Sequence, residues 1–297
     1  MKIYDSFMFF DEEMLLDLRL NIMNKYVDKF IITEATFMHS GKSKKLIFDI
    51  NKFSKFKDKI IYNVVEKEPS NIEMINKEDT EETKGNKLIH NSIKRENFQR
   101  DMSKKILLEA EDDDIILIND IDEIPNLEEV NFNNINNKLI IFKQKTFCYK
   151  FNLMYENLIW YGSRACKKKN FISPQWLRNI KHKKYPLWRL DLIFSKKKYS
   201  DIHYIKNGGW HFTNIKSPKD LEKKFQNFLH HHEFILSGLN LKKIDDMVKN
   251  KKILYDLGMD KKDYKWEGTK TLNKVEISEM PEYLAKNYTK YANWLET

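Results

Sequence analysis

The sequence predicts an α/β fold in which a mostly parallel sheet is flanked by helices, with a helical C-terminal extension packed on it. Strand-like and helix-like segments alternate along the N-terminal part of the chain, and this alternation favours parallel strands joined by crossovers. The wholly apolar run "IILI" at 115–118 is typical of a strand buried on both faces. We expect the main domain over residues 1–215 and the extension over 216–297.

The first elements follow the order strand, helix, strand. The segments "KIYDSFMFF" at 2–10 and "DKFIITEAT" at 28–36 predict two strands, and the apolar core of the second ends at Glu34. Between them, Leu15 and Leu18 begin a row of apolar residues at helical spacing. This order places Glu34 at the carboxyl edge of the predicted sheet, where ligands of such folds bind.

The later segments continue the alternation. In order, we expect a polar loop at 37–45, a strand at 58–65, an acidic surface loop at 66–85, a helix at 86–111, a strand at 115–120 and further strands at 137–153. The segment "IHYIKNGGWHFTNI" at 202–215 predicts a late strand broken at Gly208 and Gly209. A Ser-Pro-Lys-Asp helix start at 217–220 opens the helical remainder.

Composition indicates a folded protein of the reduced cytosol. The chain has 297 residues, 41% hydrophobic content and 19 Phe, which permits a large core despite 33% charged residues. Its two cysteines, Cys148 and Cys166, form neither a disulfide framework nor a metal-binding spacing. The acidic N-terminal segment does not resemble a signal peptide, and no run approaches the ~18 apolar residues of a membrane span. We therefore expect a soluble, cytoplasmic protein.

Positive charge is concentrated in one stretch, residues 164–198. This stretch contains twelve Lys or Arg residues and one acid, Asp191, so its net charge is +11, and the rest of the chain is −2. Phe171, Trp176 and Tyr185 are interleaved with the basic residues. Such a pattern suits phosphate groups, nucleic acid or an anionic membrane surface. The alternative is the solvated face of a Lys-rich protein.

The acidic turn "NDIDEIP" follows the buried strand directly. Asp120 and Asp122 are two residues apart, so in an extended segment both side chains point to the same side. Two converging carboxylates repel each other unless they share a cation. Mg²⁺ and Mn²⁺ prefer oxygen ligands and often bind a few carboxylates together with substrate phosphates. The turn therefore predicts a metal–diphosphate site, with an acidic surface turn as the alternative.

Six ordered motifs give the chain a resemblance to a known family. They are "YDSFMFFDEEMLLDLRLN", "DKFIITEATFMHSGKSKKL", "RENFQRD", "LINDIDEIP", "GGWHF" and "PEYLAKNYTKYANWL". Together they resemble glycosyltransferase family 17, the β-1,4-mannosyl-glycoprotein β-1,4-N-acetylglucosaminyltransferases, from Tyr4 to about Trp294. The resemblance implies a GT-A-like (Rossmann-type) fold, a divalent metal, Mn²⁺ or Mg²⁺, and a nucleotide-sugar donor such as UDP-GlcNAc.

The resemblance also implies roles for individual residues. The acids of its DxD motif are Asp120 and Asp122, the expected metal ligands, and the histidine of "GGWHF" is His211, expected to complete the metal shell. His211 packed in the core beside Trp210 is the alternative. Glu123 lies in the same acidic motif and is the first choice for a catalytic residue, together with Asp122.

The donor is expected to contact residues from four other positions. Glu34 lies at the carboxyl edge of the second strand, and Arg164 opens the basic stretch, where a guanidinium can hold phosphate bidentately. The motif "RENFQRD" supplies Arg95 and Arg100, and periodicity does not decide which of them faces the diphosphate. Glu96 and Arg100 share a helix face, and this pair is more often a surface ion pair than a site.

These observations predict a metal-dependent glycosyltransferase that moves a sugar, most simply N-acetylglucosamine, onto a glycan hydroxyl with inversion. Inversion requires a carboxylate to accept the hydroxyl proton, and Glu123, Glu34 and Asp191 are the candidates. We expect a glycan or lipid-linked glycan acceptor, as in surface polysaccharide biosynthesis, with peripheral anionic membrane contact and no nucleic acid. The alternatives are a nucleic-acid-binding module that uses residues 164–198 and a metal-dependent phosphohydrolase or nucleotidyltransferase.

Overall fold

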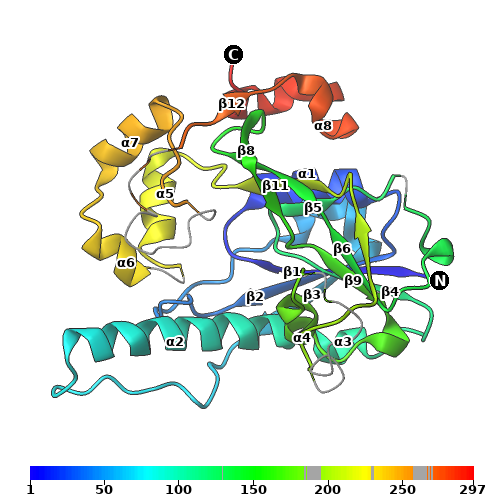
Figure 1. The fold of residues 1–297 in the computed structure, drawn as a ribbon, viewed down its shortest axis with the longest axis horizontal. Helices are drawn as coiled ribbons and strands as arrows, with labels where there is room; N and C mark the ends of the chain where they lie inside the picture. Colours follow the sequence, from blue (N-terminus) through cyan, green and yellow to red (C-terminus); the bar gives the residue numbers. More distant parts are fainter. Residues whose placement is uncertain are drawn as a thin grey trace.

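The computed structural model describes residues 1–128, 130–183, 185, 195–228, 231–256, 266, 268 and 270–297. Asp191, one of the candidate proton acceptors, lies outside these residues. Within them the chain forms two β-sheets with helices packed against both, so the predicted α/β class is confirmed. In Figure 1, α2, α3 and α4 lie below the strands, α8 lies above them, and α5 to α7 lie together at one end.

The larger sheet has seven strands in the order β10-β6-β9-β4-β1-β2-β3. They are β1 (Ile3–Phe9), β2 (Lys29–Ala35), β3 (Ile60–Val65), β4 (Ile115–Ile118), β6 (Leu139–Phe142), β9 (Arg164–Lys167) and β10 (Ile202–Ile205). The run β3-β2-β1-β4 is parallel throughout, as predicted for the N-terminal part. Every residue of β4 is buried, which confirms the interpretation of its apolar sequence.

The second sheet has five strands in the order β12-β8-β7-β11-β5. They are β5 (Glu123–Pro125), β7 (Gln144–Cys148), β8 (Leu153–Trp160), β11 (Gly209–Thr213) and β12 (Asn273–Lys274). The predicted late strand at 202–215 is therefore two strands, because residues 206–208 separate β10 in the first sheet from β11, which begins at Gly209, in the second. The broken strand connects the two sheets.

The expectation of a mostly parallel sheet is wrong, because both sheets are mixed. Strand β9 runs antiparallel to both β4 and β6 in the first sheet, and β8 runs antiparallel to β7 and β12 in the second. The reason is a long hairpin that spans both sheets. Only Lys143 separates β6 from β7, the chain reverses through residues 149–152, and β8 leads back to β9. A hairpin return can pair only antiparallel.

Eight α-helices are formed by the described residues. They are α1 (Glu13–Met23), α2 (Glu81–Asp101), α3 (Lys104–Leu107), α4 (Pro174–Asn179), α5 (Pro218–Phe225), α6 (His231–Leu236), α7 (Leu241–Lys249) and α8 (Glu282–Lys286). Helix α2 begins five residues before its predicted start, because the Thr80 hydroxyl accepts a hydrogen bond from the Thr83 amide and caps it. None of the described helices has the length and apolar character needed to cross a bilayer.

Short 3₁₀ helices complete the described structure. They cover Ile50–Lys59, Phe132–Asn134, Lys168–Asn170, Ile277–Glu279 and Tyr288–Trp294. The last of them follows α8, which contacts α1 on the N-terminal part of the chain. The hydrophobic clusters draw on both sides of residue 215, since Tyr291 packs with the main core and Phe225 packs with Tyr155 in a second cluster. The division at residue 215 stays a prediction.

A buried ion pair fixes the acidic turn relative to the sheet. Arg19 on α1 and Asp5 on β1 are both fully buried and form two hydrogen bonds of 2.8 and 2.6 Å. Arg19 also donates to the backbone carbonyl of Glu123 at 2.5 Å, and the Asn119 amide donates to Asp5 at 2.6 Å. Because these groups have no access to water, loss of either charge would leave the other unpaired. The pair therefore locks the start of the turn in position.

Candidate active site

The turn between β4 and β5 directs its two aspartates to different partners. Residues 121–122 form a turn, so the extended geometry expected for Asp120 and Asp122 does not hold. Asp120 faces two arginines, whereas the Asp122 carboxylate lies 3.8 Å from Nε2 of His211 on β11. The backbone carbonyl of Asp122 accepts a hydrogen bond from the Phe212 amide at 2.7 Å, which holds the turn against β11.

A chain of ion pairs runs behind the turn. Glu96 and Arg100 on α2 are 2.7 Å apart, Arg100 lies 3.0 Å from Asp120, and Arg178 on α4 lies 2.7 Å from Asp120. Burial alone would raise the pKa of Asp120, but Arg178 and Arg100 outweigh burial and hold it below its ordinary value. The Glu96–Arg100 pair, expected at the surface, thus belongs to this network, and Asp120 stays ionised.

Glu123 is enclosed behind the same network. Its side chain is 0% exposed. One carboxylate oxygen accepts from the Trp160 indole at 2.6 Å and from Arg178 at 3.0 Å. The other accepts from Arg178 at 2.8 Å and from the Asp120 amide at 2.8 Å. Both oxygens are thus occupied, and the side chain supports Arg178 and the turn.

His211 is held neutral beside Asp122. Its ring stacks on Trp160 with centroids 4.5 Å apart, and burial lowers the pKa of the imidazole to about 3. Its Nδ1 is buried and has no hydrogen-bond partner among the described residues. Burial raises the pKa of Asp122 to about 7, with Asp120 and Glu123 adding to the shift and Lys224 opposing it. The pair therefore combines an unsatisfied nitrogen with a carboxylate whose charge is poorly compensated.

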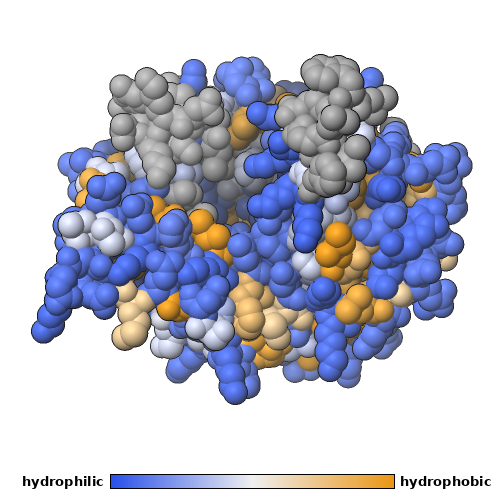
Figure 2. Space-filling model, turned by 60° about the horizontal axis from the view of Figure 1, so that its bottom comes forward, coloured by the Kyte–Doolittle hydropathy of each residue, from blue (hydrophilic) through white to orange (hydrophobic). Residues whose placement is uncertain are grey.

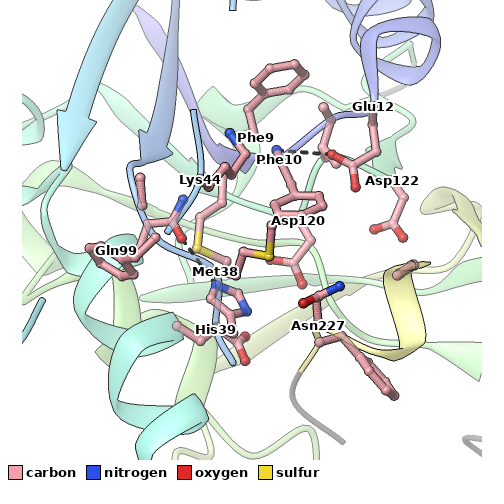
Figure 3. A pocket seen from close by; sticks show the side chains of 17 residues that line it. Phe9, Phe10, Glu12, Met38, His39, Lys44, Gln99, Asp120, Asp122 and Asn227 are labelled. Atoms are coloured by element: carbon pink, nitrogen blue, oxygen red, sulfur yellow. Dashed lines mark hydrogen bonds between the residues drawn. The ribbon is translucent and has the colours of Figure 1, made fainter. Parts of the chain in front are cut away.

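A cavity of about 250 Å³ opens in front of these residues (Figure 3). Its acidic lining is Glu12, Glu96, Asp120 and Asp122, and its basic lining is Lys44 and Lys224. Apolar side chains from the ends of β1 and β2 and from the following loops also line it: Met8, Phe9, Phe10, Ala35, Phe37 and Met38. Figure 3 shows Asn227 facing Asp120 and Asp122 across the cavity. The site thus lies beyond the carboxyl ends of parallel strands, where ligands of such sheets bind.

The predicted donor residues lie at different depths around this cavity. Arg100 faces the acidic turn, whereas Arg95 pairs with Glu68 at 2.6 Å and donates to the His39 carbonyl at 3.3 Å. Arg164 is buried and donates to the backbone carbonyl of Arg178, and burial followed by the charge of Arg178 lowers its pKa to about 9.

Glu34 is fully buried and faces the loop after β2. It accepts hydrogen bonds from the Lys44 ammonium, from the Ile47 and Phe48 amides at 2.9 and 3.1 Å, and from the Tyr62 hydroxyl at 2.8 Å. Glu34 therefore anchors the segment that carries Lys44 to the cavity. The lining residues of the cavity do not include it.

Three residues of the site were not predicted from the sequence. Arg178 pairs with Asp120 and Glu123, Lys224 on α5 lines the cavity, and Glu12 lines it from the start of α1. A signal was present for Glu12, since it follows directly after the first strand, at the edge where ligands bind. Arg178 and Lys224 lie in Lys- and Arg-rich stretches, where no local pattern distinguishes an inward from an outward side chain.

Metal-ligating side chains are sparse in this arrangement. Among the residues that the structure describes, no group of three or more His, Cys, Asp or Glu side chains is arranged to hold a metal ion. Asp122 and His211 face each other, while Asp120 is turned toward the arginines. Asp122 therefore presents its carboxylate to the cavity, and His211 lies beside it on β11 with an unpartnered Nδ1.

Comparison with known proteins places the chain in a family. A search of curated proteins gives no significant match. The family model of glycosyltransferase family 17 matches residues 1–296, essentially the whole chain. The resemblance carried by the six sequence motifs is confirmed by this match, and a glycosyltransferase requires a donor and an acceptor substrate. The chain belongs to glycosyltransferase family 17.

Proposed function

We propose that this protein transfers a sugar from a nucleotide-sugar donor to a glycan hydroxyl, and that the donor diphosphate binds between Asp122 and Lys224. The observation that carries the proposal is the cavity itself, which unites the acidic turn and a lysine beyond parallel strand ends, with His211 3.8 Å from the Asp122 carboxylate. Uridine diphosphate N-acetylglucosamine is the donor we propose, because the family resemblance implies it. The parallel run β3-β2-β1-β4 with the acidic turn after β4 supports a GT-A type of fold.

A divalent cation, Mn²⁺ or Mg²⁺, fits the donor atoms of Asp122 and His211. The poorly compensated carboxylate and the unpartnered imidazole are ligands that such a cation accepts. A bound cation would neutralise charge that builds up on the leaving diphosphate. Asp120, paired with two arginines, then shapes the turn from behind rather than supplying the first ligand.

Lys224 supplies a positive charge on the side of the proposed diphosphate site that lies opposite Asp122. Its ammonium is 2.8 Å from the side-chain oxygen of Asn214, a neutral partner, and it lines the cavity with Asp122. Asn214 has a left-handed backbone, with φ of 57°. We propose that Lys224 faces a phosphate oxygen of the donor, because a preorganised cation stabilises the leaving group without reorganising water.

Transfer with inversion also requires a proton acceptor at the cavity. In the proposed step the acceptor oxygen bonds to the anomeric carbon, the bond to the diphosphate breaks with its electron pair, and the hydroxyl proton passes to a carboxylate. Glu123 is buried with both oxygens occupied, so we propose a positioning role for it. Among the described lining carboxylates, Glu96 and Asp120 pair with arginine, whereas Glu12 accepts two backbone amides at 3.1 Å and lies 3.8 Å from the Lys216 ammonium. We propose Glu12 as the acceptor.

The test is a thermal-stability screen of nucleotide sugars with and without Mn²⁺. Wild-type protein should be stabilised by UDP-GlcNAc only when Mn²⁺ is present, and Asp122→Asn should lose this stabilisation. Asp113→Asn is the matched control, because Asp113 is 69% exposed and pairs only with Lys167 and Lys169 among the described residues. Stabilisation that is equal in Asp122→Asn and wild type would overturn the proposed site.

Product analysis separates the rival enzymatic reading. A phosphohydrolase or nucleotidyltransferase at the same cavity would release phosphate or pyrophosphate, whereas the transferase releases nucleoside diphosphate and a new glycoside.

Parts of the basic stretch, residues 164–198, are internal or paired, since Arg164 and Arg178 face inward and Lys169 pairs with Asp113 at 2.9 Å. Figure 2 shows a mainly hydrophilic face on which hydrophobic residues form small, separate groups. We also propose peripheral contact with an anionic membrane, a cytoplasmic location and a lipid-linked acceptor.

A further inference from the structure

A second cavity of about 220 Å³ adjoins the first and has no role in the proposed donor site. The two cavities share two lining residues, Lys224 and Phe228 on and after α5. The second cavity lies between α5 and the sheet β12-β8-β7-β11-β5, and its size exceeds that of an ordered water. Together the two cavities reach the size of a small-molecule site, roughly 300–1,000 Å³.

One face of the second sheet forms the floor of the second cavity and continues to His211 beside the acidic turn. His211 on β11 is in register with Thr146 on β7, and Thr146 is in register with Tyr155 on β8. Side chains alternate along each strand, so Thr213, two residues after His211, lies on the same face. The opposite face carries Phe147 and Phe212, which pack in the main core. The sheet therefore leads from the proposed cation ligand directly into the second cavity.

The floor of this cavity contains an unsatisfied hydroxyl. Thr146 is 1% exposed, and its Oγ1 has no hydrogen-bond partner among the described residues. The Tyr149 hydroxyl, by contrast, donates to the Lys252 carbonyl and accepts from the Leu254 amide. A buried hydroxyl without a partner costs free energy unless a ligand or water satisfies it. Thr146 therefore marks the position where a polar atom of a ligand fits.

The walls of the cavity are mainly aromatic. Tyr155, Phe225, Phe228 and Tyr255 line it, together with the apolar Leu158 and Ile253. Burial raises the pKa of the Cys148 thiol to about 12, so this lining residue is neutral. Lys224 is the charged residue in the described lining, and it stands at the boundary with the first cavity. Such a site suits a neutral, disc-shaped molecule with hydroxyl groups at its edge.

We propose that the second cavity is the acceptor subsite and binds one neutral pyranose unit of the acceptor glycan. The aromatic walls would cover the apolar faces of the ring, and Thr146 would bind one ring hydroxyl. A sugar held there has its neighbouring hydroxyl at Lys224, where the first cavity begins. The assignment of this cavity to the acceptor rests on the proposed function. Binding of a sugar to the cavity can be measured separately, without turnover of the donor.

The experiment uses simple methyl glycosides as probes on the full-length protein. Saturation-transfer NMR with methyl β-glucoside, β-galactoside, α-mannoside and β-N-acetylglucosaminide should detect binding of at least one. Thr146→Val, which keeps the shape but removes the hydroxyl, should weaken that binding at least tenfold. Thr213→Val, with the side chain on the same face, is a second variant and should also weaken it. No detectable glycoside binding by the wild type, or binding by both variants that equals that of the wild type, would overturn the proposal.

Two controls keep the outcomes separate. Thr33→Val removes another buried hydroxyl, on β2, whose Oγ1 accepts from Asn63 at 3.3 Å outside both cavities, and it should leave glycoside binding unchanged. Melting curves check that each variant is folded. Stabilisation of the wild type by UDP and Mn²⁺ is measured in parallel. UDP binding without glycoside binding would overturn the acceptor subsite alone, and glycoside binding without UDP binding would overturn the donor proposal alone.

Discussion

At the residue scale, neighbouring acids of the same turn have different ionisation properties because their partners differ. Two guanidinium groups hold the pKa of Asp120 below its ordinary value, whereas burial raises the pKa of Asp122 to about 7. The difference arises from Arg100 and Arg178, which reach only one of the two carboxylates. Without a bound cation, the ionised carboxylate of Asp122 therefore destabilises the folded state at neutral pH.

The first prediction is that Asp122→Asn stabilises the metal-free protein at pH 8. Between the ordinary pKa of 3.8 and about 7, the folded state binds more protons at Asp122 than the unfolded state does. The contribution of Asp122 to stability therefore falls as pH rises through this window. We expect the free energy of unfolding of Asp122→Asn to exceed that of wild type by roughly 1–3 kcal/mol at pH 8 and to match it near pH 4.

Urea denaturation in EDTA at the two pH values measures this difference. Asp113→Asn provides a control of opposite sign, because hydrogen bonding to Lys169 and the charges of Lys169 and Lys167 lower the pKa of Asp113. The free energy of unfolding of Asp113→Asn should therefore not exceed that of wild type at pH 8. Equal stabilities of wild type and Asp122→Asn at both pH values would show that Asp122 is well solvated.

The second prediction concerns Arg178, whose side chain pairs with two carboxylates. Arg178→Met leaves Asp120 and Glu123 without this cation, and breaking a buried pair typically costs about 3–5 kcal/mol. Lys169→Met, at a half-exposed lysine that pairs with Asp113, should cost under ~1 kcal/mol. Urea denaturation measures both values.

A double variant tests whether the cost of Arg178→Met arises from the unpaired charge. Adding Glu123→Gln should recover part of the lost stability, because the neutral amide needs no cation. Additive losses in the double variant would instead assign the cost to packing around the Arg178 side chain.

The sequence drew attention to the acidic turn but not to its arginine partner. Asp120, Asp122 and His211 could be singled out because they follow a recognisable buried strand or a motif with glycines, and their roles stay predictions. Arg178 could not, because a basic residue in a stretch with a net charge of +11 carries no local sign of facing inward. Its orientation depends on how α4 packs against α2 and β9, which is a tertiary property.

At the element scale, the paired glycines allow the chain to pass from one sheet to the other. A Cβ on Gly208 would lie 2.4 Å from the Lys143 amide nitrogen, and one on Gly209 would lie 2.2 Å from the Ile124 carbonyl oxygen. From the sequence, these glycines predicted a break in the late strand. The structure shows close approach of backbone to backbone, where the chain leaves the first sheet after β10 and β11 pairs with β5.

The third prediction uses two glycines with positive φ. Gly209 has φ of 108° and is crowded, whereas Gly238 has φ of 65° and nothing within 4 Å of an added Cβ. Gly238→Ala should cost only the backbone strain, about 1–2 kcal/mol. Gly209→Ala should cost clearly more, because the added carbon also displaces β5. Equal losses of melting temperature for the two variants would contradict close packing at this crossing.

Strand direction in the hairpin could not be predicted from residue patterns alone. The run at 137–153 was correctly expected to contain strands, yet an apolar strand has the same pattern whether its neighbour is parallel or antiparallel. The direction follows from the reversal at residues 149–152, where Tyr149 has a positive φ of 65°. No glycine or proline marks that reversal, so the turn signal was absent from the sequence.

At the scale of the whole molecule, the C-terminal segment completes cores that begin near the N-terminus. Tyr291 is 1% exposed, stacks edge-to-face on Phe151 and donates to Asp17 on α1 at 2.8 Å. The Phe151 amide donates to the Trp294 carbonyl at 2.8 Å, and the Asn152 side chain bonds the backbone of Glu296. These contacts join sequence positions far apart, so they depend on the complete fold.

The last prediction is that a chain ending at residue 215 does not fold cooperatively. Such a chain lacks Leu284 and Tyr291 from the main core and Leu221 and Phe225 from the second, and each is at most 2% exposed in the full-length protein. Full burial of one such side chain contributes roughly 1.5–3 kcal/mol, so the combined loss is comparable to the whole stability of a domain, ~5–15 kcal/mol. Circular dichroism during urea denaturation should show a shallow transition for residues 1–215 and a sharp one for the full chain. A truncated chain that unfolds as sharply as the full chain would instead establish an independent main domain, as the sequence division at residue 215 predicts.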